Sequence, residues 1–169
     1  WSRMDRFVLI TGASTGIGAA LAREFAAQGF SLVITGRDGD ALANLASSLG
    51  EDVVVRMVTA DLSTPVGVDD LIATVNSMAI EIEILVNNAG ITAERGGIEI
   101  VDEAFFQRMY DVHVKGTFFT TQAVVPGMKE RGRGKIVNVS SMWASTGHPT
   151  GATYIAAKGA ILGLTKAWA

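Results

Sequence analysis

The sequence predicts an α/β fold, a doubly wound parallel sheet with helices on both of its faces. Short apolar runs rich in β-branched residues alternate with helical patterns along the chain. Alternation at this spacing is typical of βαβ units, whose right-handed crossovers cover both faces of a parallel sheet. The first apolar run also leads directly into a glycine-rich turn and a helix. We expect a single domain over residues 1–169.

Each expected element follows from its own pattern. The first strand is apolar throughout, as a strand buried on both faces is. The strands are expected at residues 7–11, 31–35, 53–58, 84–87 and 135–140. Helical patterns cover residues 16–28, 40–49, 65–78, 102–129 and 153–169, and the fourth can break near Asp111. Thr64 and Pro65 form a good helix start, because threonine caps helices and proline fits the first helical position.

Polar side chains and glycines gather where the expected strands end. The glycine-rich turn follows the first strand, and Arg37, Asp61, Asn88 and Ser141 follow the other four. In an open parallel sheet, ligands bind beyond the carboxyl ends of the strands. The sequence therefore predicts one binding site at this edge of the sheet.

Composition limits the classes of function that remain. Hydrophobic residues make up 49% of the chain and charged residues 18%, which excludes a disordered protein. The net charge is −3 with no basic stripe, so we expect neither nucleic acid nor a membrane as a partner. No apolar run approaches the roughly 20 residues of a spanning helix. With no cysteine and two histidines, we expect no disulfide and no metal site, and we predict a cytoplasmic location.

The turn at residues 11–18 has the composition of a phosphate-binding loop. Gly12, Gly16 and Gly18 are spaced G-x3-G-x-G, which differs from the commoner G-x-G-x-x-G. A glycine-rich turn between a strand and a helix lets backbone N–H groups and the positive helix N-terminus face a diphosphate. The alternative is an ordinary tight turn that closes a βα unit.

Tyr154 and Lys158 form a Y-x-x-x-K pattern, and Ser141 lies 13 residues before the tyrosine. Four residues make about one helical turn, so both side chains project from one helix face. An ammonium close to a phenol favours the phenolate and lowers a phenol's pKa from about 10. Such a phenol can give a proton to a carbonyl oxygen or take one from an alcohol, while a serine hydroxyl holds that oxygen. These groups suit a carbonyl/alcohol redox site.

Six motifs, taken in order, resemble those of the short-chain dehydrogenase/reductase family. They are T-G-A-S-T-G-I-G from Thr11 to Gly18, Asp61-Leu62, Asn87-Asn-Ala-Gly90, Lys115-Gly116, Ser140-Ser141 and Tyr154-x-x-x-Lys158. The resemblance covers essentially the whole chain and implies a Rossmann fold that binds NADP or NAD. It also implies an oxidoreductase that transfers a hydride between the cofactor and a ketone or secondary alcohol.

The resemblance assigns roles to the catalytic groups. Tyr154 would be the general acid/base, Lys158 would tune it and bind the nicotinamide ribose, and Ser141 would bind the substrate oxygen. Ser140 is the competing serine, and the family spacing favours Ser141. His113 departs from the pattern, because the family usually has asparagine there, in a water-mediated proton relay. Imidazole also donates and accepts, so both a relay and simple packing on the helix stay open.

The resemblance also implies which residues bind the dinucleotide. They are Gly12, Ser14, Thr15, Gly16, Ile17, Gly18, Arg37, Asp61, Leu62, Asn88, Ala89 and Gly90, with Tyr154 and Lys158. Arg37 follows the second strand, where arginine pairs with the 2′-phosphate of NADP and an acidic residue binds the ribose of NAD. We therefore expect NADP. NAD is the alternative, because Asp38 can pair with Arg37 or cap the next helix, and Thr15 is neutral. Asp61 lies against adenine in relatives, or caps the segment that follows it.

Members of the family run to about 250 residues, and this chain stops inside the helix that carries Tyr154. We expect the fold to be truncated there, without the last two strands and the segment that covers the substrate. The fifth strand would then have an open edge, and the isolated chain would bind cofactor weakly at best.

Further expectations concern partners. Relatives assemble as dimers or tetramers through the helix after Asp102 and the Tyr154 helix, so a homo-oligomer is expected for the full protein. The substrate would be a small carbonyl or alcohol, flanked by Trp143, His148 and residues 91–97. Two other functions stay open, a non-catalytic dinucleotide-binding module and a purely structural interaction protein.

Overall fold

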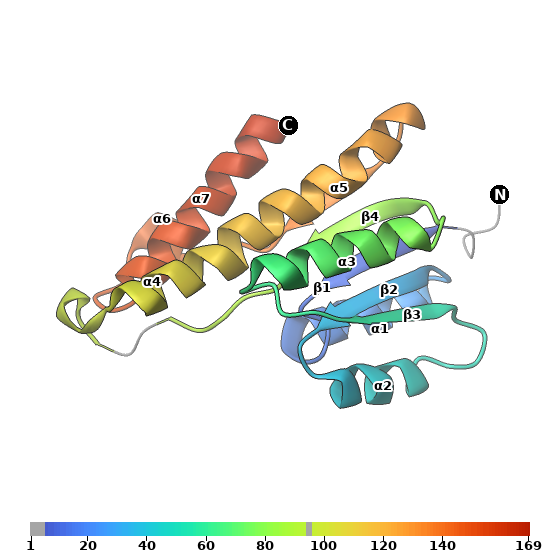
Figure 1. The fold of residues 1–169 in the computed structure, drawn as a ribbon, viewed down its shortest axis with the longest axis horizontal. Helices are drawn as coiled ribbons and strands as arrows, with labels where there is room; N and C mark the ends of the chain where they lie inside the picture. The colour runs from blue at the N-terminus through green and yellow to red at the C-terminus, as the bar shows by residue number, and fades with distance from the viewer. Residues whose placement is uncertain (1–5, 94–95) are drawn as a thin grey trace.

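The computed structural model describes residues 6–93 and 96–169, in which five strands form one sheet (Figure 1). The strands are β1 (Phe7–Thr11), β2 (Ser31–Gly36), β3 (Val55–Thr59), β4 (Ile82–Asn87) and β5 (Lys135–Asn138). Neighbouring strands are parallel, in the order β3-β2-β1-β4-β5. The order reverses at β1, from which the chain builds outward first to β3 and then to β5. In such sheets the ligand binds at the reversal point, beyond the carboxyl ends of the strands.

Helices alternate with the strands as the sequence predicts. They are α1 (Gly16–Ala27), α2 (Gly39–Ser47), α3 (Pro65–Ser77), α4 (Glu103–Tyr110), α5 (Gly116–Glu130), α6 (Trp143–Thr146) and α7 (Ala152–Trp168). A π-helical segment, η3 (Asp111–Lys115), joins α4 to α5, and the three form one rod with α7 beside it (Figure 1). The predicted doubly wound parallel sheet, a Rossmann fold, is confirmed.

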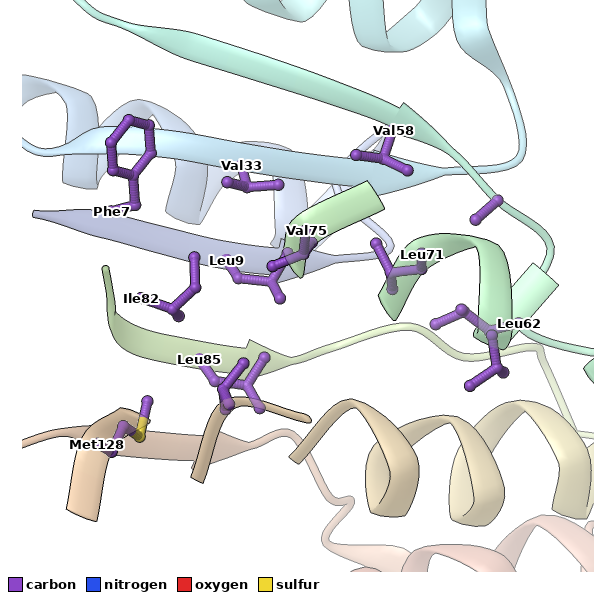
Figure 2. Packing of buried hydrophobic residues seen from close by; sticks show 13 residues of the cluster. Phe7, Leu9, Val33, Val58, Leu62, Leu71, Val75, Ile82, Leu85 and Met128 are labelled. Carbon is purple, nitrogen blue, oxygen red and sulfur yellow. The ribbon is translucent and has the colours of Figure 1, made fainter. Parts of the chain in front are cut away.

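Two hydrophobic cores lie on the two faces of the sheet. Side chains alternate along a strand, so Leu9 points to one face while Val8 and Ile10 point to the other. The face with Leu9 packs against α3 and α5, and Figure 2 shows Leu71 of α3 and Leu85 of β4 in this core. The opposite face packs against α1 and α2. Full burial of a leucine contributes roughly 1.5–3 kcal/mol, so the two cores hold the strands in register.

The strand boundaries differ from the expected ones by two residues at both sheet edges and at the start of β4, which begins at Ile82 rather than at residue 84. β3 begins at Val55 rather than at residue 53, and β5 ends at Asn138 rather than at residue 140. An edge strand pairs on one side only, so it extends only as far as its neighbour does. β4 ends at Asn87, which is paired with Asn138, and the β5 ladder stops there. Among the described residues the outer side of β5 has no partner strand.

The helix expected at residues 102–129 is divided at Asp111, where the chain widens into η3. Asp102 caps α4 by accepting a hydrogen bond from the N–H of Phe105 at 2.7 Å. Thr64 caps α3 in the same way, as predicted. Two short helical turns were not predicted, η2 (Ile98–Ile100) and α6. Residues 94 and 95 of the loop after β4 lie outside the described residues.

Candidate active site

A cavity of ≈ 1100 Å³ lies at the carboxyl ends of the strands, where the sequence predicts a binding site. It is lined by most of the predicted site residues, namely Gly12, Ser14, Thr15, Ile17, Arg37, Asp61, Leu62, Asn88, Ala89, Gly90, His113, Ser141, Tyr154 and Lys158. Two predicted residues, Gly16 and Gly18, do not line it. Trp143 lines the cavity as expected, but His148 does not.

The turn between β1 and α1 packs tightly against the loop that follows β4. Gly12 has a φ of 65°, and a Cβ there would lie 2.7 Å from the Cα of Ala89. A Cβ at Gly18 would lie 2.6 Å from Nδ2 of Asn88. That amide nitrogen donates to the carbonyl oxygens of Thr11 and Gly12, at 3.0 Å each. Gly18 therefore acts by allowing close packing beneath the turn rather than by touching a ligand.

Thr11 contributes to this junction and was not among the predicted site residues. Its Oγ1 accepts hydrogen bonds from the backbone N–H groups of Asn88 and Ala89, at 3.0 Å each. It thus fastens the loop after β4 to the end of β1. Its signal in the sequence was its place at the start of the T-G-A-S-T-G-I-G motif, as a polar residue at the end of an apolar strand.

The N-terminus of α1 lies at the cavity, with Thr15 and Ile17 among the lining residues. Thr15 occupies the capping position, but its side chain makes no capping hydrogen bond within the described part of the chain. The first turn of α1 also carries no acidic side chain. The first N–H groups of a helix have no partner inside the helix and carry its positive dipole end. This cradle therefore suits an anionic group such as a diphosphate.

Arg37 and Asp61 line the part of the cavity next to β2 and β3. Asp38 accepts a hydrogen bond from the N–H of Ala41 at 2.9 Å and caps α2, one of the two roles that the sequence left open. Asp61 accepts from the backbone and hydroxyl of Ser63, at 2.9 and 2.7 Å, so its carboxylate also organises the turn before α3. Burial raises the pKa of Asp61, but these hydrogen bonds and the charge of Arg37 outweigh it and lower the pKa overall.

Tyr154 and Lys158 lie one turn apart on α7, as predicted. The side chain of Lys158 is buried, and its Nζ donates to the carbonyl oxygen of Val139 at 2.7 Å. The same Nζ lies 5.7 Å from the centre of the Tyr154 ring. Burial lowers the pKa of Lys158 to about 8, so its ammonium persists at neutral pH.

The two serines after β5 have different partners. Ser140 Oγ donates to the carbonyl oxygen of Lys158 at 2.8 Å, which ties the end of β5 to α7. Ser141 Oγ accepts from the N–H of Trp143 at 3.2 Å and lines the cavity. Because Ser141 accepts the bond from Trp143 through an oxygen lone pair, its hydroxyl hydrogen is left for another acceptor.

His113 lies in η3 with 1% of its surface exposed. Its Nε2 is 3.1 Å from both the backbone nitrogen and the backbone oxygen of Ile91, and its ring meets Tyr154 edge-on at 5.5 Å. Its Nδ1 is buried without a partner among the described residues. Burial lowers the pKa of His113 to about 4, with a further lowering by the charge of Lys158. The imidazole is therefore neutral at pH 7.

Within residues 6–93 and 96–169, no helix is long and apolar enough to cross a membrane. The same residues contain no group of three histidine, cysteine, aspartate or glutamate side chains that could hold a metal ion. The cytoplasmic location and the absence of a metal stay predictions.

Comparison with known proteins gives a consistent result. The sequence pattern described as short chain dehydrogenase matches residues 6–169. The NADP-dependent 3-hydroxy acid dehydrogenase of Salmonella typhi is 35% identical over 154 residues, covering 89% of this chain and 60% of that protein. The NADP-dependent (R)-specific alcohol dehydrogenase of Lentilactobacillus kefiri is 34% identical, covering 95% and 64%.

Solved structures show the same likeness. A short-chain dehydrogenase from Sphingobium yanoikuyae in complex with NADPH superposes with a TM-score of 0.89 at 34% identity, covering 96% of this chain and 63% of that one. The chain thus spans a little under two thirds of the length of these relatives.

Proposed function

Because the chain belongs to the short-chain dehydrogenase family, we propose that the whole protein is an NADP-dependent oxidoreductase that interconverts a ketone and a secondary alcohol. One observation carries the proposal: Ser141, Tyr154 and Lys158 line the same cavity as the β1–α1 turn and Arg37. An acid–base group therefore shares one space with a cradle that suits a dinucleotide.

The residues present fit NADP. The close approach at Gly12 and the open N–H groups of α1 suit the diphosphate. Arg37 is exposed at the cavity and suits the 2′-phosphate, and Asp38 is occupied as the cap of α2. Two relatives are named as NADP-dependent, and a third was solved with NADPH, which supports a cofactor of the NADP type.

The chemistry divides between the cofactor and the chain. A bound nicotinamide would supply the hydride for reduction of a carbonyl carbon, or accept the hydride in the oxidation of an alcohol. In the reduction, the Ser141 hydroxyl donates to the carbonyl oxygen and Tyr154 gives that oxygen a proton. In the oxidation, Tyr154 takes the proton from the alcohol. The ammonium of Lys158 stabilises the negative oxygen that proton transfer leaves on Tyr154.

His113 holds the loop after β4 in place through Nε2, which accepts from the N–H of Ile91 or donates to its carbonyl oxygen, depending on the tautomer. Its buried Nδ1 is the atom through which a water-mediated proton relay would run. In this assignment the imidazole takes the place of the asparagine that supports the relay in most of the family, because each side chain offers both a donor and an acceptor.

Replacing Tyr154 by phenylalanine tests the proposal. We expect the whole protein to oxidise NADPH in the presence of ketones, and Tyr154→Phe to lower kcat by roughly 100-fold or more. The dissociation constant for NADPH should change little, because the phenol hydroxyl is the only group removed. Tyr110→Phe is the matched control, since Tyr110 is on α4, stacks on Phe106 and does not line the cavity. Tight NADPH binding with no ketone reduction would favour the non-catalytic module instead.

A further inference from the structure

Three side chains lie against the ring of Tyr154, the proposed acid–base group. The imidazole of His113 and the indole of Trp143 meet the ring edge-on, with ring centres 5.5 and 6.0 Å away. The Nζ of Lys158 lies 5.7 Å from the ring centre. A tyrosine on a helix can occupy more than one rotamer, and the neighbouring side chains decide which one it takes. The place of the phenol oxygen therefore depends on how firmly these three neighbours are held.

Two of the three neighbours are buried and anchored by hydrogen bonds. The Nε2 of His113 lies 3.1 Å from the backbone nitrogen and oxygen of Ile91. The Nζ of Lys158 donates to the carbonyl oxygen of Val139 at 2.7 Å. Trp143 differs, because it is half-buried and begins the short helix α6. The position of its indole therefore depends on what packs against it.

His148 packs against that indole. Its imidazole stacks on the ring of Trp143, with ring centres 4.0 Å apart and planes 17° apart. The imidazole is fixed in turn, because its Nδ1 lies 3.0 to 3.3 Å from the carbonyl oxygen, the amide nitrogen and the hydroxyl oxygen of Thr150. The chain leaves α6 at Gly147, whose φ of 74° is a conformation that glycine readily adopts. A Cβ on Gly151 would lie 3.7 Å from the indole, so the backbone packs against it as well.

A series of contacts therefore runs from the surface to the acid–base group. His148 is exposed and does not line the cavity, whereas Trp143 and Tyr154 do. We propose that His148 is a positioning residue, which holds Trp143 against Tyr154 and thereby fixes the place of the phenol oxygen. The inference rests on the proposed function, which supplies the reaction, and adds a residue that controls its rate without touching the substrate.

The place of His148 outside the cavity predicts that kcat and KM respond differently to its loss. Proton transfer needs the phenol oxygen within hydrogen-bond reach of the substrate oxygen. Because a small displacement of a reacting group is costly, His148→Ala should lower the kcat of the whole protein by about tenfold. KM for the ketone and Kd for NADPH should stay within about twofold, since no side chain that lines the cavity is changed. The solvent deuterium isotope effect on kcat should rise, because proton transfer from Tyr154 becomes slower.

These constants are measured with saturating NADPH and with whichever of ethyl acetoacetate, acetophenone and cyclohexanone the wild type reduces fastest. His148→Phe keeps a flat ring over the indole and should retain at least about half of the wild-type kcat. Thr146→Ala is the matched control, because Thr146 is an exposed residue of the same short helix and does not line the cavity. Its kcat should stay within about twofold of the wild type.

A double-mutant cycle tests whether His148 acts through Trp143. Trp143→Ala removes the indole itself, so adding His148→Ala to it should lower kcat further by less than about twofold. If the two losses instead multiply in the double variant, His148 does not act through the indole and the proposal is overturned.

The ring signals of Tyr154 in nuclear magnetic resonance give a measurement that does not need turnover. In the whole protein, isotope-labelled in its tyrosine rings, the Tyr154 signal is the one that Tyr154→Phe removes. His148→Ala should shift this signal, because the indole beside the ring is released, and His148→Phe should leave it close to its wild-type position. The signal of Tyr110, which lies on α4 and stacks on Phe106, should not move in either variant.

The two measurements distinguish a failure of this inference from a failure of the proposed function. If no ketone is reduced but His148→Ala shifts the Tyr154 signal and His148→Phe does not, the reaction is wrong and the positioning role stands. If ketones are reduced but His148→Ala keeps the wild-type kcat or leaves the Tyr154 signal in place, the reaction stands and the inference is overturned. Neither turnover nor a shift would overturn both.

Discussion

Lys158 and His113 are both buried against the cavity, and their charges are coupled. Burial lowers the pKa of Lys158 to about 8 and that of His113 to about 4, and the charge of Lys158 adds to the second shift. At neutral pH, Lys158 therefore keeps its proton while His113 is neutral. The site carries one positive charge next to Tyr154, and a second one would be repelled by the first.

We expect His113 to make the folded protein sensitive to acid. Its pKa is about 4 in the folded state and about 6.5 in the unfolded state, so only the unfolded state gains the proton between these values. The stability contributed by neutral His113 is present above pH 6.5 and is lost as the pH falls toward 4. Between pH 7 and pH 5, the wild type should lose about 2 kcal/mol more free energy of unfolding than His113→Asn.

Urea denaturation at pH 7 and pH 5 measures the loss of free energy of unfolding in each protein. Groups that titrate in both the wild type and His113→Asn contribute equally to the two losses, so they cancel in the difference. Lys158 is protonated in both states over this range, so it does not contribute. His148→Asn is the matched control, because His148 is exposed, and it should lose as much stability as the wild type. An equal loss in His113→Asn would show that His113 is not held neutral by the fold.

Arg37 should select the cofactor through a single charge-assisted contact. Replacing it by alanine should raise the dissociation constant for NADPH by roughly tenfold or more, because a hydrogen-bonded ion pair contributes about 1.5–3 kcal/mol. The constant for NADH should stay within about twofold. Arg56→Ala removes the same charge from an exposed position on β3 and should affect neither cofactor. Fluorescence titration of the variants with NADPH and NADH measures these dissociation constants. An equal loss of affinity for NADPH and NADH in Arg37→Ala would refute the 2′-phosphate assignment.

At the scale of elements, α7 is aligned with β5 by a series of hydrogen bonds. Asn138 Nδ2 donates to Thr165 Oγ1 at 2.9 Å, and Ser140 Oγ donates to the carbonyl oxygen of Lys158 at 2.8 Å. Asn138 in turn accepts from Asn87 on β4 at 2.9 Å. The helix that carries Tyr154 is therefore positioned by the sheet itself.

Alanine replacements of the two adjacent serines should separate alignment from chemistry. Ser140→Ala removes the bond to α7 and should lower the free energy of unfolding by about 1 kcal/mol, with a modest loss of kcat. Ser141→Ala should change stability by less than about 0.5 kcal/mol while lowering kcat by roughly 100-fold, because it removes the group that holds the substrate oxygen. Denaturation and steady-state kinetics on both variants provide the measurement. The reverse pattern would assign the catalytic role to Ser140.

The strand–turn–helix at the start of the chain was predictable because its glycines, apolar run and helical pattern are all local. The break at Asp111 could be anticipated, but its form as a π-helical segment depends on how α4 and α5 pack. α6 was not predictable, since the contact that fixes it, Trp143 on His148, exists only in the folded loop. Thr11 was missed for the same reason, because its partners lie 77 and 78 residues away in the sequence.

At the scale of the whole molecule, aromatic side chains are exposed along α5 and at the end of α7. Phe118, Phe119 and Trp168 are 38%, 42% and 37% exposed. The ring centres of Phe118 and Trp168 lie 5.9 Å apart. α7 lies beside the rod formed by α4, η3 and α5 (Figure 1), and the contact between Trp168 and Phe118 connects the end of α7 to the first part of α5. Large exposed apolar side chains that cluster on one face are typical of protein–protein contacts.

We expect this face to join copies of the protein into a dimer or tetramer, the assembly predicted from the family. Replacing Phe118 and Phe119 together by serine should shift the whole protein to a smaller species in sedimentation velocity, because it removes apolar area that only association would bury. Val66→Ser is the control, since Val66 is a 67% exposed apolar residue on a different helix, α3. The double variant should still bind NADPH, which shows that it is folded. If it sediments like the wild type while Val66→Ser is smaller, the contact lies on the α3 side instead.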